Sequence, residues 1–459
     1  MIIFSDFYQN SGVFIYIRPI GFYNFHALFT PTEEKNPMTR ILKCIKCGKE
    51  YPIDEIRYKC DCGGLLEVKI DRLPGPEIVK VWDSRLGSKK SVDQSGVWRY
   101  REFVFDVRNP VTYPEGRTNL YQLPPAIADM EKLYAKHEGE NPTGSFKDRG
   151  MTVGISFAKE LGFKSVACAS TGNTSASLAA YAARAGLKAI VFLPQGKVAT
   201  GKLAQALAYG ATIFQIKGDF DDAMKIVIKI SQDMGIYLLN SMNPIRLEGQ
   251  KTIIIDILSQ LNWESPDWIV LPGGNLGNTS AFGKALRELK EARIINKIPR
   301  LATIQADGAA PFYKSFMENF KIFAPLKAET VATAIRIGNP VNFEKARDSI
   351  IFTDGVVESV SDLEILEAKA DLDAIGIGCE PASAASLAGL RKLLKKGIIS
   401  RDQKVVLVLT GNLLKDPEIV EKIHTGKIES FKEKFKNQII NVDPDLGDIK
   451  KKLEQILEK

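Results

Sequence analysis

The sequence contains no long hydrophobic run. No apolar stretch approaches the roughly 18 to 20 residues that a helix needs to cross a bilayer. The most apolar piece near the beginning, residues 13–20, is interrupted by Arg18 and Pro19 and would make a poor core for a secretion signal. We therefore expect no membrane partner.

A concentrated basic block is also missing. The 62 lysines and arginines exceed the 55 acidic residues, giving a net charge of +7, but they are dispersed along the chain. This mild excess suits an anionic small molecule as well as a nucleic acid, so the net charge decides little. Without a concentrated basic block, we expect no nucleic-acid partner. The hydrophobic and charged fractions, 45% and 25%, are typical of a globular protein, and the 459 residues suggest about three domains.

Cysteine is scarce outside one short segment. Four of the six cysteines lie between Cys44 and Cys62, while Cys168 and Cys379 stand alone in core-like surroundings. Two closely spaced pairs in a chain of this length do not form the disulfide framework of a small secreted domain. The pattern is typical of a reducing compartment, so we expect a cytoplasmic protein.

The paired cysteines have nearly the spacing of a zinc ribbon. Cys44-x-x-Cys47 and Cys60-x-Cys62 are each followed by glycine, which lets the chain turn and direct paired thiolates at one tetrahedral metal. The second pair has one intervening residue where two are usual. We predict a structural zinc ion, because four sulfur ligands leave no position for a substrate. The alternative is a ribbon-shaped module that holds no metal.

Changes in composition suggest the domain boundaries. Residues 1–37 are rich in aromatic residues and follow neither a helical nor a strand period, so we expect them to be disordered or to precede the true start at Met38. The tail ends in a short amphipathic helix from Asp448, which we expect to pack on the body of the protein; the alternative is contact with a second subunit. The other predicted parts are a ribbon at 38–72, a main domain at 73–430 with a smaller subdomain at about 150–240, and a charged tail at 431–459.

Beyond about Lys164, short β-branched runs alternate with helical patterns. Near-continuous apolar strands separated by amphipathic helices indicate an α/β fold with parallel sheet covered on both faces. In such folds the ligand site lies beyond the carboxyl ends of the strands. The predicted strands are Ser165–Ala169, Ala189–Leu193, Thr212–Ile216, Tyr237–Leu239, Trp268–Leu271, Ala302–Gln305 and Val405–Leu409. The predicted helices are Ser175–Ala185, Lys202–Tyr209, Ala223–Met234, Gln250–Leu261, Ser280–Glu291 and Ser383–Lys395.

Three of the predicted strands run directly into polar loops with glycine, at Ser170–Ser175, Gly273–Thr279 and Thr410–Asn412. Each loop alone is more often an ordinary turn and helix cap. The glycine-rich one is the natural phosphate cradle, because glycine lets the backbone approach and a helix N-terminus favours an anion. Its spacing matches neither the P-loop nor the dinucleotide motif, so nucleotide binding is not favoured.

One lysine stands out in the segment Glu138–Gly150, which reads EGENPTGSFKDRG. A lone lysine is usually a solvated charge, but Lys147 follows a Pro-Thr-Gly turn and precedes a stretch that can open a helix. We expect Pro142, Gly144 and Phe146 to pack around it. Burial and a nearby cation such as Arg149 would then lower the pKa of the amine and make it nucleophilic.

Four motifs in a fixed order carry a family resemblance. They are ENPTGSFKDRG, ASTGNTSAS, LPGGNLGN and TGNLLKDP, within about residues 113–417. With them the chain resembles the fold-type II pyridoxal-phosphate enzymes, and the threonine synthases in particular. The segment NSMNPIR at 240–246 separates threonine synthases from dehydratases and cysteine synthases, and the run from Glu380 to Ser383 is a further mark. The cysteine-rich front also resembles that of threonine synthases with an N-terminal zinc ribbon.

The resemblance implies a fold similar to the tryptophan synthase β chain, with two open-sheet α/β subdomains and the active site between them. It implies that Lys147 holds pyridoxal phosphate as a Schiff base and carries protons. The other implied positions are Asn173 for the 3′ oxygen of the cofactor, Gly273, Gly274, Asn275, Leu276, Gly277 and Asn278 for its phosphate, Thr410 for its pyridine nitrogen, Asn240, Ser241 and Arg246 for the substrate phosphate, and Ser170 and Thr171 for the substrate carboxylate.

The implied reaction is a β,γ-replacement that converts O-phospho-L-homoserine and water to L-threonine and phosphate, in a homodimer. One alternative is a related lyase, such as threonine dehydratase or a phospho-amino-acid sulfonate-forming enzyme. A dehydratase has no second phosphate to bind, so Arg246 discriminates against it. An alternative of another class is a zinc-ribbon nucleic-acid-binding protein with an inactive body.

Two departures from the family pattern bear on these assignments. Asn412-Leu413 stands where the family usually has His-Gly, beside Thr410, and affects the surroundings implied for the pyridine nitrogen. Thr118-Asn119-Leu120 stands where Thr-Pro-Leu is usual. Neither touches the residues implied to bind phosphate.

Overall fold

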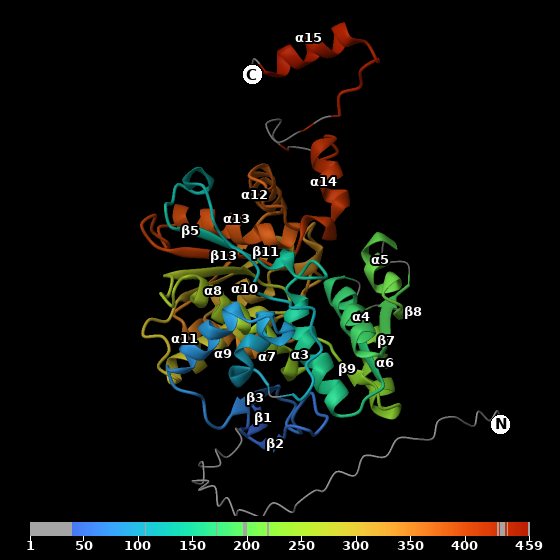
Figure 1. The fold of residues 1–459 in the computed structure, drawn as a ribbon, viewed down its shortest axis with the longest axis vertical. Coiled ribbons are helices and arrows are strands. Elements are labelled where there is room, and N and C mark those ends of the chain that lie inside the picture. The colour runs from blue at the N-terminus through green and yellow to red at the C-terminus, as the bar shows by residue number, and fades with distance from the viewer. Residues whose placement is uncertain are drawn as a thin grey trace, which may run out of the picture. The chain divides into compact units, whose positions relative to one another are not determined.

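The computed structural model describes residues 39–105, 107–170, 172–195, 200–217, 220–428, 431, 437 and 439–457 (Figure 1). The expectations for residues 1–37 lie outside these ranges. Within them, no helix combines the length and the apolar composition needed to cross a membrane.

Three short antiparallel strands form the cysteine-rich module, in the order β2-β1-β3. Leu42 of the central strand pairs with Tyr51 on one side and Val68 on the other, and all three side chains are buried. This small core holds the sheet together. The strands are β1 (Arg40–Cys44), β2 (Glu50–Pro52) and β3 (Leu66–Ile70).

The larger of the other two sheets has the order β12-β11-β10-β13-β5-β4. Its neighbours are parallel except β4, which runs antiparallel to β5. The central strands β10 and β13, WIVLP and VVLVL, are buried along their whole length, as expected for parallel strands covered on both faces. The bounds are β4 (Leu120–Gln122), β5 (Leu133–His137), β10 (Trp268–Pro272), β11 (Arg300–Ala306), β12 (Val356–Val360) and β13 (Val405–Leu409).

The smaller sheet is parallel throughout, in the order β8-β7-β6-β9. Its edge strand β9 is only two residues long and pairs with the middle of β6. The α/β fold with two open sheets is therefore confirmed, while the domain boundaries stay a prediction. The strands are β6 (Ser165–Ala169), β7 (Lys188–Pro194), β8 (Thr212–Ile216) and β9 (Tyr237–Leu238).

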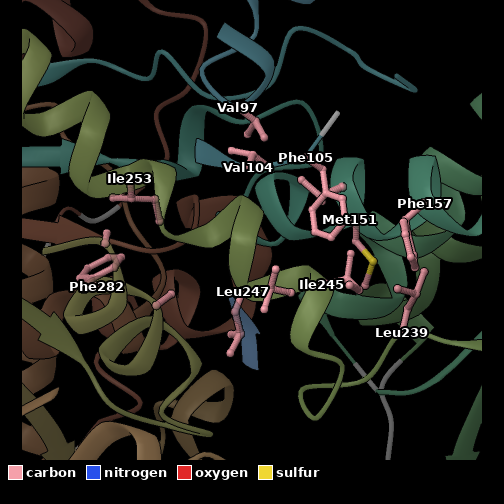
Figure 2. Close-up of a cluster of buried hydrophobic side chains, with 14 of the residues drawn as sticks. Val97, Val104, Phe105, Met151, Phe157, Leu239, Ile245, Leu247, Ile253 and Phe282 are labelled. Carbon is pink, nitrogen blue, oxygen red and sulfur yellow. The ribbon is translucent and has the colours of Figure 1, made fainter. Parts of the chain in front are cut away.

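Helix α3 (Lys147–Glu160) begins at the singled-out lysine and is buried along most of its length. Glycines let its neighbours approach closely: a Cβ on Gly150 would lie 3.0 Å from the carbonyl oxygen of Arg246, and one on Gly154 would lie 2.4 Å from Cδ2 of Leu239. Figure 2 shows Phe157 of α3 beside Leu239 in this core. The helix that begins at Lys147 thus packs closely against the segment that contains Arg246.

The remaining helices agree with the predicted ones to within a few residues wherever a prediction was made. They are α1 (Ile78–Ser84), α2 (Ser91–Gln94), α4 (Asn173–Ala185), α5 (Thr200–Ala208), α6 (Phe220–Asp233), α7 (Pro244–Gln250), α8 (Thr252–Gln260), α9 (Gly277–Glu291), α10 (Pro311–Met317), α11 (Phe343–Phe352), α12 (Asp362–Ala374), α13 (Pro381–Lys395), α14 (Pro417–His424) and α15 (Leu446–Leu457).

The expected docking of the C-terminal helix is wrong. Helix α15 forms at about the predicted place, but it has no buried residue. Its apolar residues Leu453, Ile456 and Leu457 are 49%, 51% and 82% exposed. An amphipathic pattern specifies a helix with one apolar face, but it does not specify what covers that face.

Candidate active site

The loop before Lys147 is joined to the loop that follows β13. The N–H of Phe146 donates to the carbonyl oxygen of Thr410 at 3.0 Å. The N–H of Asn412 donates to the carbonyl oxygen of Gly144 at 2.9 Å. Asn412, which stands where the family usually has histidine, therefore helps through its backbone N–H to fix the turn before Lys147.

Lys147 has the surroundings of a reactive amine. Its Nζ lies 3.8 Å from the centre of the Phe146 ring, and no described residue accepts a hydrogen bond from it. Burial and then the positive charge of Arg246 lower the pKa of this amine to about 7, against the opposing influence of Glu380. A large fraction of the amine is therefore neutral near pH 7, as a nucleophile or proton acceptor requires.

The cation expected beside Lys147 was wrongly identified as Arg149. The guanidinium of Arg149 is fully buried and pairs with Glu138 and with Asp256, each at 2.7 Å. Buried charges need such partners, so Arg149 belongs to a structural ion network. Pro142 is exposed and does not enclose the lysine, whereas the ring of Phe146 lies against Nζ of Lys147.

Glu380 connects two of the residues implied to bind the cofactor, and no role was predicted for it. Nδ2 of Asn173, at the first turn of α4, donates to this carboxylate at 3.0 Å, and Oγ1 of Thr410 donates at 3.4 Å. Oγ of Ser383 lies 3.0 Å from the same threonine hydroxyl. Burial raises the pKa of Glu380. A carboxylate directly before helix α13, inside a motif already marked, was the available signal.

Gly411 makes this arrangement possible. A Cβ at this position would lie 2.5 Å from Cδ of Glu380. Any side chain here would therefore displace the carboxylate. The motif Thr-Gly-Asn thus needs its glycine for close approach.

The glycine-rich loop presents backbone donors that nothing in the described chain uses. Between Gly274 and Thr279, where the loop enters helix α9, no backbone N–H has an acceptor among the described residues. Leu276 adopts a left-handed conformation, with φ of 61°, at the N-cap of this helix. Unpaired N–H groups at a helix N-terminus bind an anion, so the loop fits a phosphate group.

Arg246 is a buried cation that has no carboxylate partner among the described residues. Its side chain is 2% exposed, and no ion pair with a described residue involves it. Nη1 donates to the carbonyl oxygen of Leu239 at 3.1 Å, while Nε has no hydrogen-bond partner. Burial lowers the pKa of this guanidinium to about 10. An uncompensated buried charge is costly, which points to an anionic ligand as its missing partner.

Asn342, for which no role was predicted, and Gln250, which belongs to the further family mark GQKT at 249–252, join the two phosphate-binding candidates. Nδ2 of Asn342 donates to the carbonyl oxygens of Ser241 and Asn275, at 3.1 Å and 3.2 Å. Nε2 of Gln250 donates to Oδ1 of Asn278 at 2.7 Å. The segment around Arg246 and the glycine-rich loop are therefore adjacent.

Asn240 is held by backbone rather than directed into open space. Its Oδ1 accepts from the N–H of Ala169 at 3.0 Å, and its Nδ2 donates to the carbonyl oxygen of the same residue at 3.1 Å. These bonds connect the ends of β6 and β9. Direct contact of this side chain with a substrate phosphate stays a prediction.

The residues expected at the substrate carboxylate are only partly described. Ser170 is half-buried at the end of β6, and its Oγ accepts from the N–H of Gly172 at 3.3 Å. Thr171 lies outside the described residues. The contacts of the described chain place Ser170 at the correct sheet edge and leave its role a prediction.

These features fit pyridoxal phosphate. The neutral amine of Lys147 can form the covalent link, and the unpaired N–H groups from Gly274 onward can hold the phosphate. The polar side chains of Asn173 and Thr410 both donate to the carboxylate of Glu380, which holds them close to one another. The orphaned buried Nε of Arg246 is left for a second anionic group.

The four clustered cysteines fit a metal ion. Their Sγ atoms all lie within 4.8 Å of one another, with 3.6 Å between Cys44 and Cys62 and 3.5 Å between Cys47 and Cys60. Tetrahedral zinc with Zn–S bonds of about 2.3 Å places its sulfur ligands about 3.8 Å apart. A Cβ on Gly64 would lie 2.8 Å from Sγ of Cys44, so the turn needs glycine there.

Comparison with known proteins gives concordant results. The family model described as "Pyridoxal-phosphate dependent enzyme" matches residues 111–411. A threonine synthase from Methanocaldococcus jannaschii is 52% identical over 382 residues, which cover 82% of this chain and 93% of that protein. A chloroplastic threonine synthase of Arabidopsis thaliana is 38% identical and covers 89% of this chain and 83% of its own.

Solved structures agree on the fold. The threonine synthase of Escherichia coli superposes with a TM-score of 0.64 at 18% identity, covering 91% of this chain and all of its own. Maize serine racemase gives a TM-score of 0.58 at 19% identity, covering 84% and 99%. At 18% and 19% identity these two structures show the fold alone. The threonine synthases found by sequence, at 52% and 38% identity over most of the chain, show the family. The chain therefore belongs to the pyridoxal-phosphate-dependent enzymes and, within them, to the threonine synthases.

Proposed function

We propose that this enzyme converts O-phospho-L-homoserine and water to L-threonine and phosphate by a β,γ-replacement. The observation that carries the proposal is Arg246, a buried guanidinium whose charge lowers the pKa of Lys147 and which has no carboxylate partner in the described chain. A substrate phosphate would supply the missing anion as a bidentate ligand. The relatives named threonine synthase support the same activity.

Lys147 carries the proton chemistry in this proposal. When bound, pyridoxal phosphate supplies an electron sink that stabilises negative charge developing on the carbon skeleton of an amino acid. The neutral Nζ of Lys147 accepts the proton from Cα of the substrate and then helps to move a proton from Cβ. Phosphate leaves from Cγ, and Cγ receives a proton in its place. Water then adds at Cβ, and the proton returns to Cα to give L-threonine.

The surrounding residues bind and orient the reacting groups. The N–H groups at the start of α9 would hold the cofactor phosphate, and Arg246 with Ser241 would hold that of the substrate. We propose that Asn240 acts mainly by fixing this segment to Ala169, because its amide already bonds that backbone. Glu380 orients Asn173 and Thr410 by accepting their hydrogen bonds.

Release of phosphate from O-phospho-L-homoserine, measured together with the amino acid formed, tests the function. Equal amounts of phosphate and L-threonine support the proposal. Deamination of L-threonine without phosphate release would instead indicate a dehydratase. Turnover that requires added sulfite would indicate a sulfonate-forming enzyme.

The pKa of Lys147 predicts how cofactor uptake depends on pH. Only the neutral amine attacks an aldehyde, so the uptake rate of cofactor-free enzyme should rise about tenfold per pH unit below pH 7 and level off above it. An ordinary lysine would not level off until about pH 10.4. In Arg246→Gln the midpoint should move to higher pH, because the neighbouring positive charge is gone. Stopped-flow absorbance measures the rate, and an unchanged midpoint would contradict the electrostatic coupling.

We propose in addition that Cys44, Cys47, Cys60 and Cys62 hold one structural zinc ion, supported by the close approach of their sulfur atoms. Purified protein should contain about one zinc per chain by metal analysis, and Cys44→Ser should lose most of it. Cys168→Ser, which changes a cysteine outside the cluster, should retain the metal. Equal zinc content in both variants would refute the site.

A cytoplasmic location and a homodimer stay predictions.

A further inference from the structure

The cysteine module reaches directly to the strand that precedes the substrate-binding segment. Oη of Tyr58 accepts a hydrogen bond from the N–H of Leu238 at 2.8 Å. The Tyr58 ring also lies against the ring of Tyr237, with 6.3 Å between their centres. This contact links positions 180 residues apart in the sequence.

Strand β9 needs such support because it is short and lies at a sheet edge. It pairs with β6 only through Tyr237 and Leu238, and no strand of the described chain lies on its other side. An edge strand leaves backbone groups unpaired, and an unpaired buried N–H costs about as much as a lost hydrogen bond. The hydroxyl of Tyr58 takes the place of the missing neighbour strand.

The same short strand holds the residue proposed to bind the substrate phosphate. The carbonyl oxygen of Leu238 accepts from Nδ2 of Asn243 at 2.9 Å, and Oδ1 of that asparagine caps helix α7 by accepting from the N–H of Ile245. The next carbonyl, that of Leu239, accepts from Nη1 of Arg246. Displacement of β9 would therefore move both the helix cap and the guanidinium.

Tyr58 is in turn attached to the cysteine cluster. It lies two residues before Cys60, whose N–H donates to the carbonyl oxygen of Gly64 at 2.9 Å. Lys59 forms an isolated antiparallel bridge with Leu65, which closes the same loop. Two of the four sulfur atoms belong to this loop, so a bound metal would fix it against the turn after β1.

We propose that the metal-holding module is a positioning device for the phosphate-binding segment, acting through Tyr58, Leu238 and Arg246. The inference rests on the proposed function, in which Arg246 binds the substrate phosphate. Metal binding orders the loop of Tyr58, and its hydroxyl fixes β9. The module thereby sets substrate affinity without contacting the reacting atoms.

Tyr58→Phe isolates the contact, because it removes only the hydroxyl. We expect KM for O-phospho-L-homoserine to rise about 3- to 10-fold while kcat changes less than about twofold, in the range of one lost hydrogen bond. The visible absorption of the cofactor should stay unchanged. Tyr121→Phe is the matched control, since it removes a hydroxyl that donates to Glu140 at 2.6 Å on an exposed part of the larger sheet.

Zinc depletion of the holoenzyme by a chelator tests the role of the metal. It should raise KM as the substitution does, and depletion of Tyr58→Phe should add little, because both changes break the same connection. Hydrogen exchange provides a readout independent of activity. The amide of Leu238 should exchange faster in Tyr58→Phe and in zinc-depleted protein, but not in Tyr121→Phe.

Three results would overturn the inference: equal KM values in the two tyrosine variants, unchanged exchange at Leu238, or zinc depletion without effect on either quantity. A wild-type enzyme that releases no phosphate from O-phospho-L-homoserine would refute the proposed function. In that case the exchange of Leu238 would still report whether the module holds β9. The two failures are therefore distinguishable.

Discussion

Replacement of Lys147 by alanine should abolish the visible absorption of bound cofactor and lower kcat by at least about 10³-fold. The amine is the only group at the start of α3 that can form the covalent link, and positioned acid–base catalysis alone contributes about 10² to 10⁴. Its lowered pKa, caused by burial and Arg246, matches that role. Absorption spectra and the phosphate-release assay measure the two losses.

The fold of this variant should persist, because alanine removes a charge that burial disfavours. Circular dichroism and the thermal midpoint check this. The matched control is Lys345→Met: burial also lowers the pKa of Lys345, to about 8, but its Nζ donates to the carbonyl oxygen of Leu66. That variant should keep its colour. Loss of absorption in the control, or its retention in Lys147→Ala, would contradict the assignment.

Replacement of Arg246 by alanine should raise KM for O-phospho-L-homoserine by about 30- to several thousand-fold. This corresponds to the roughly 2 to 5 kcal/mol typical of truncating one partner of a buried charge pair. The guanidinium has an orphaned Nε and no carboxylate partner in the described ranges, so the substrate phosphate would be its counter-ion. Steady-state kinetics measured over a range of pH separate this loss of affinity from the upward shift in the pKa of Lys147.

Two controls show which anion Arg246 binds. Arg246→Lys retains charge without the planar fork and should recover only part of the affinity. Cofactor affinity, measured by titration of cofactor-free protein, should change little in Arg246→Ala. A large loss of cofactor affinity with unchanged KM would instead assign the guanidinium to the cofactor phosphate, and unchanged kinetics throughout would refute the proposed function.

The strands predicted from the sequence pattern have no charge in their interior, and strands with an interior charge were missed. Strands β10 and β13 contain no charged residue and were expected nearly to their ends. Strands β5 and β12 contain Lys136 and Glu358, which break the apolar run. These charges are tolerated because Lys136 donates to Gln260 at 2.8 Å and Lys396 donates to Glu358 at 2.5 Å. Such partners lie far away in the sequence, so no local pattern announces them.

Some features of the candidate site could likewise be predicted from the sequence, and others could not. Its reactive lysine, the loops after β6, β10 and β13, and the sulfur cluster follow from local motifs, since each depends on residues that are neighbours along the chain. The cation that acts on Lys147 is Arg246 rather than Arg149, and Glu380 and Asn342 connect loops that are far apart in sequence. Burial and counter-charge decide these points, and both are properties of the packed molecule.

The sequence by itself determined the alternation of strands and helices, the four cysteine positions and the residues able to do chemistry, because spacing and residue type carry that information. Only the tertiary structure decided which charges are paired, that α15 has no buried residue, and that Tyr58 bonds to Leu238. Pairing and burial depend on which surfaces meet. Arg149 lies two residues from Lys147 and Arg246 lies about a hundred residues away, and only folding determines which of the two guanidinium groups acts on the lysine.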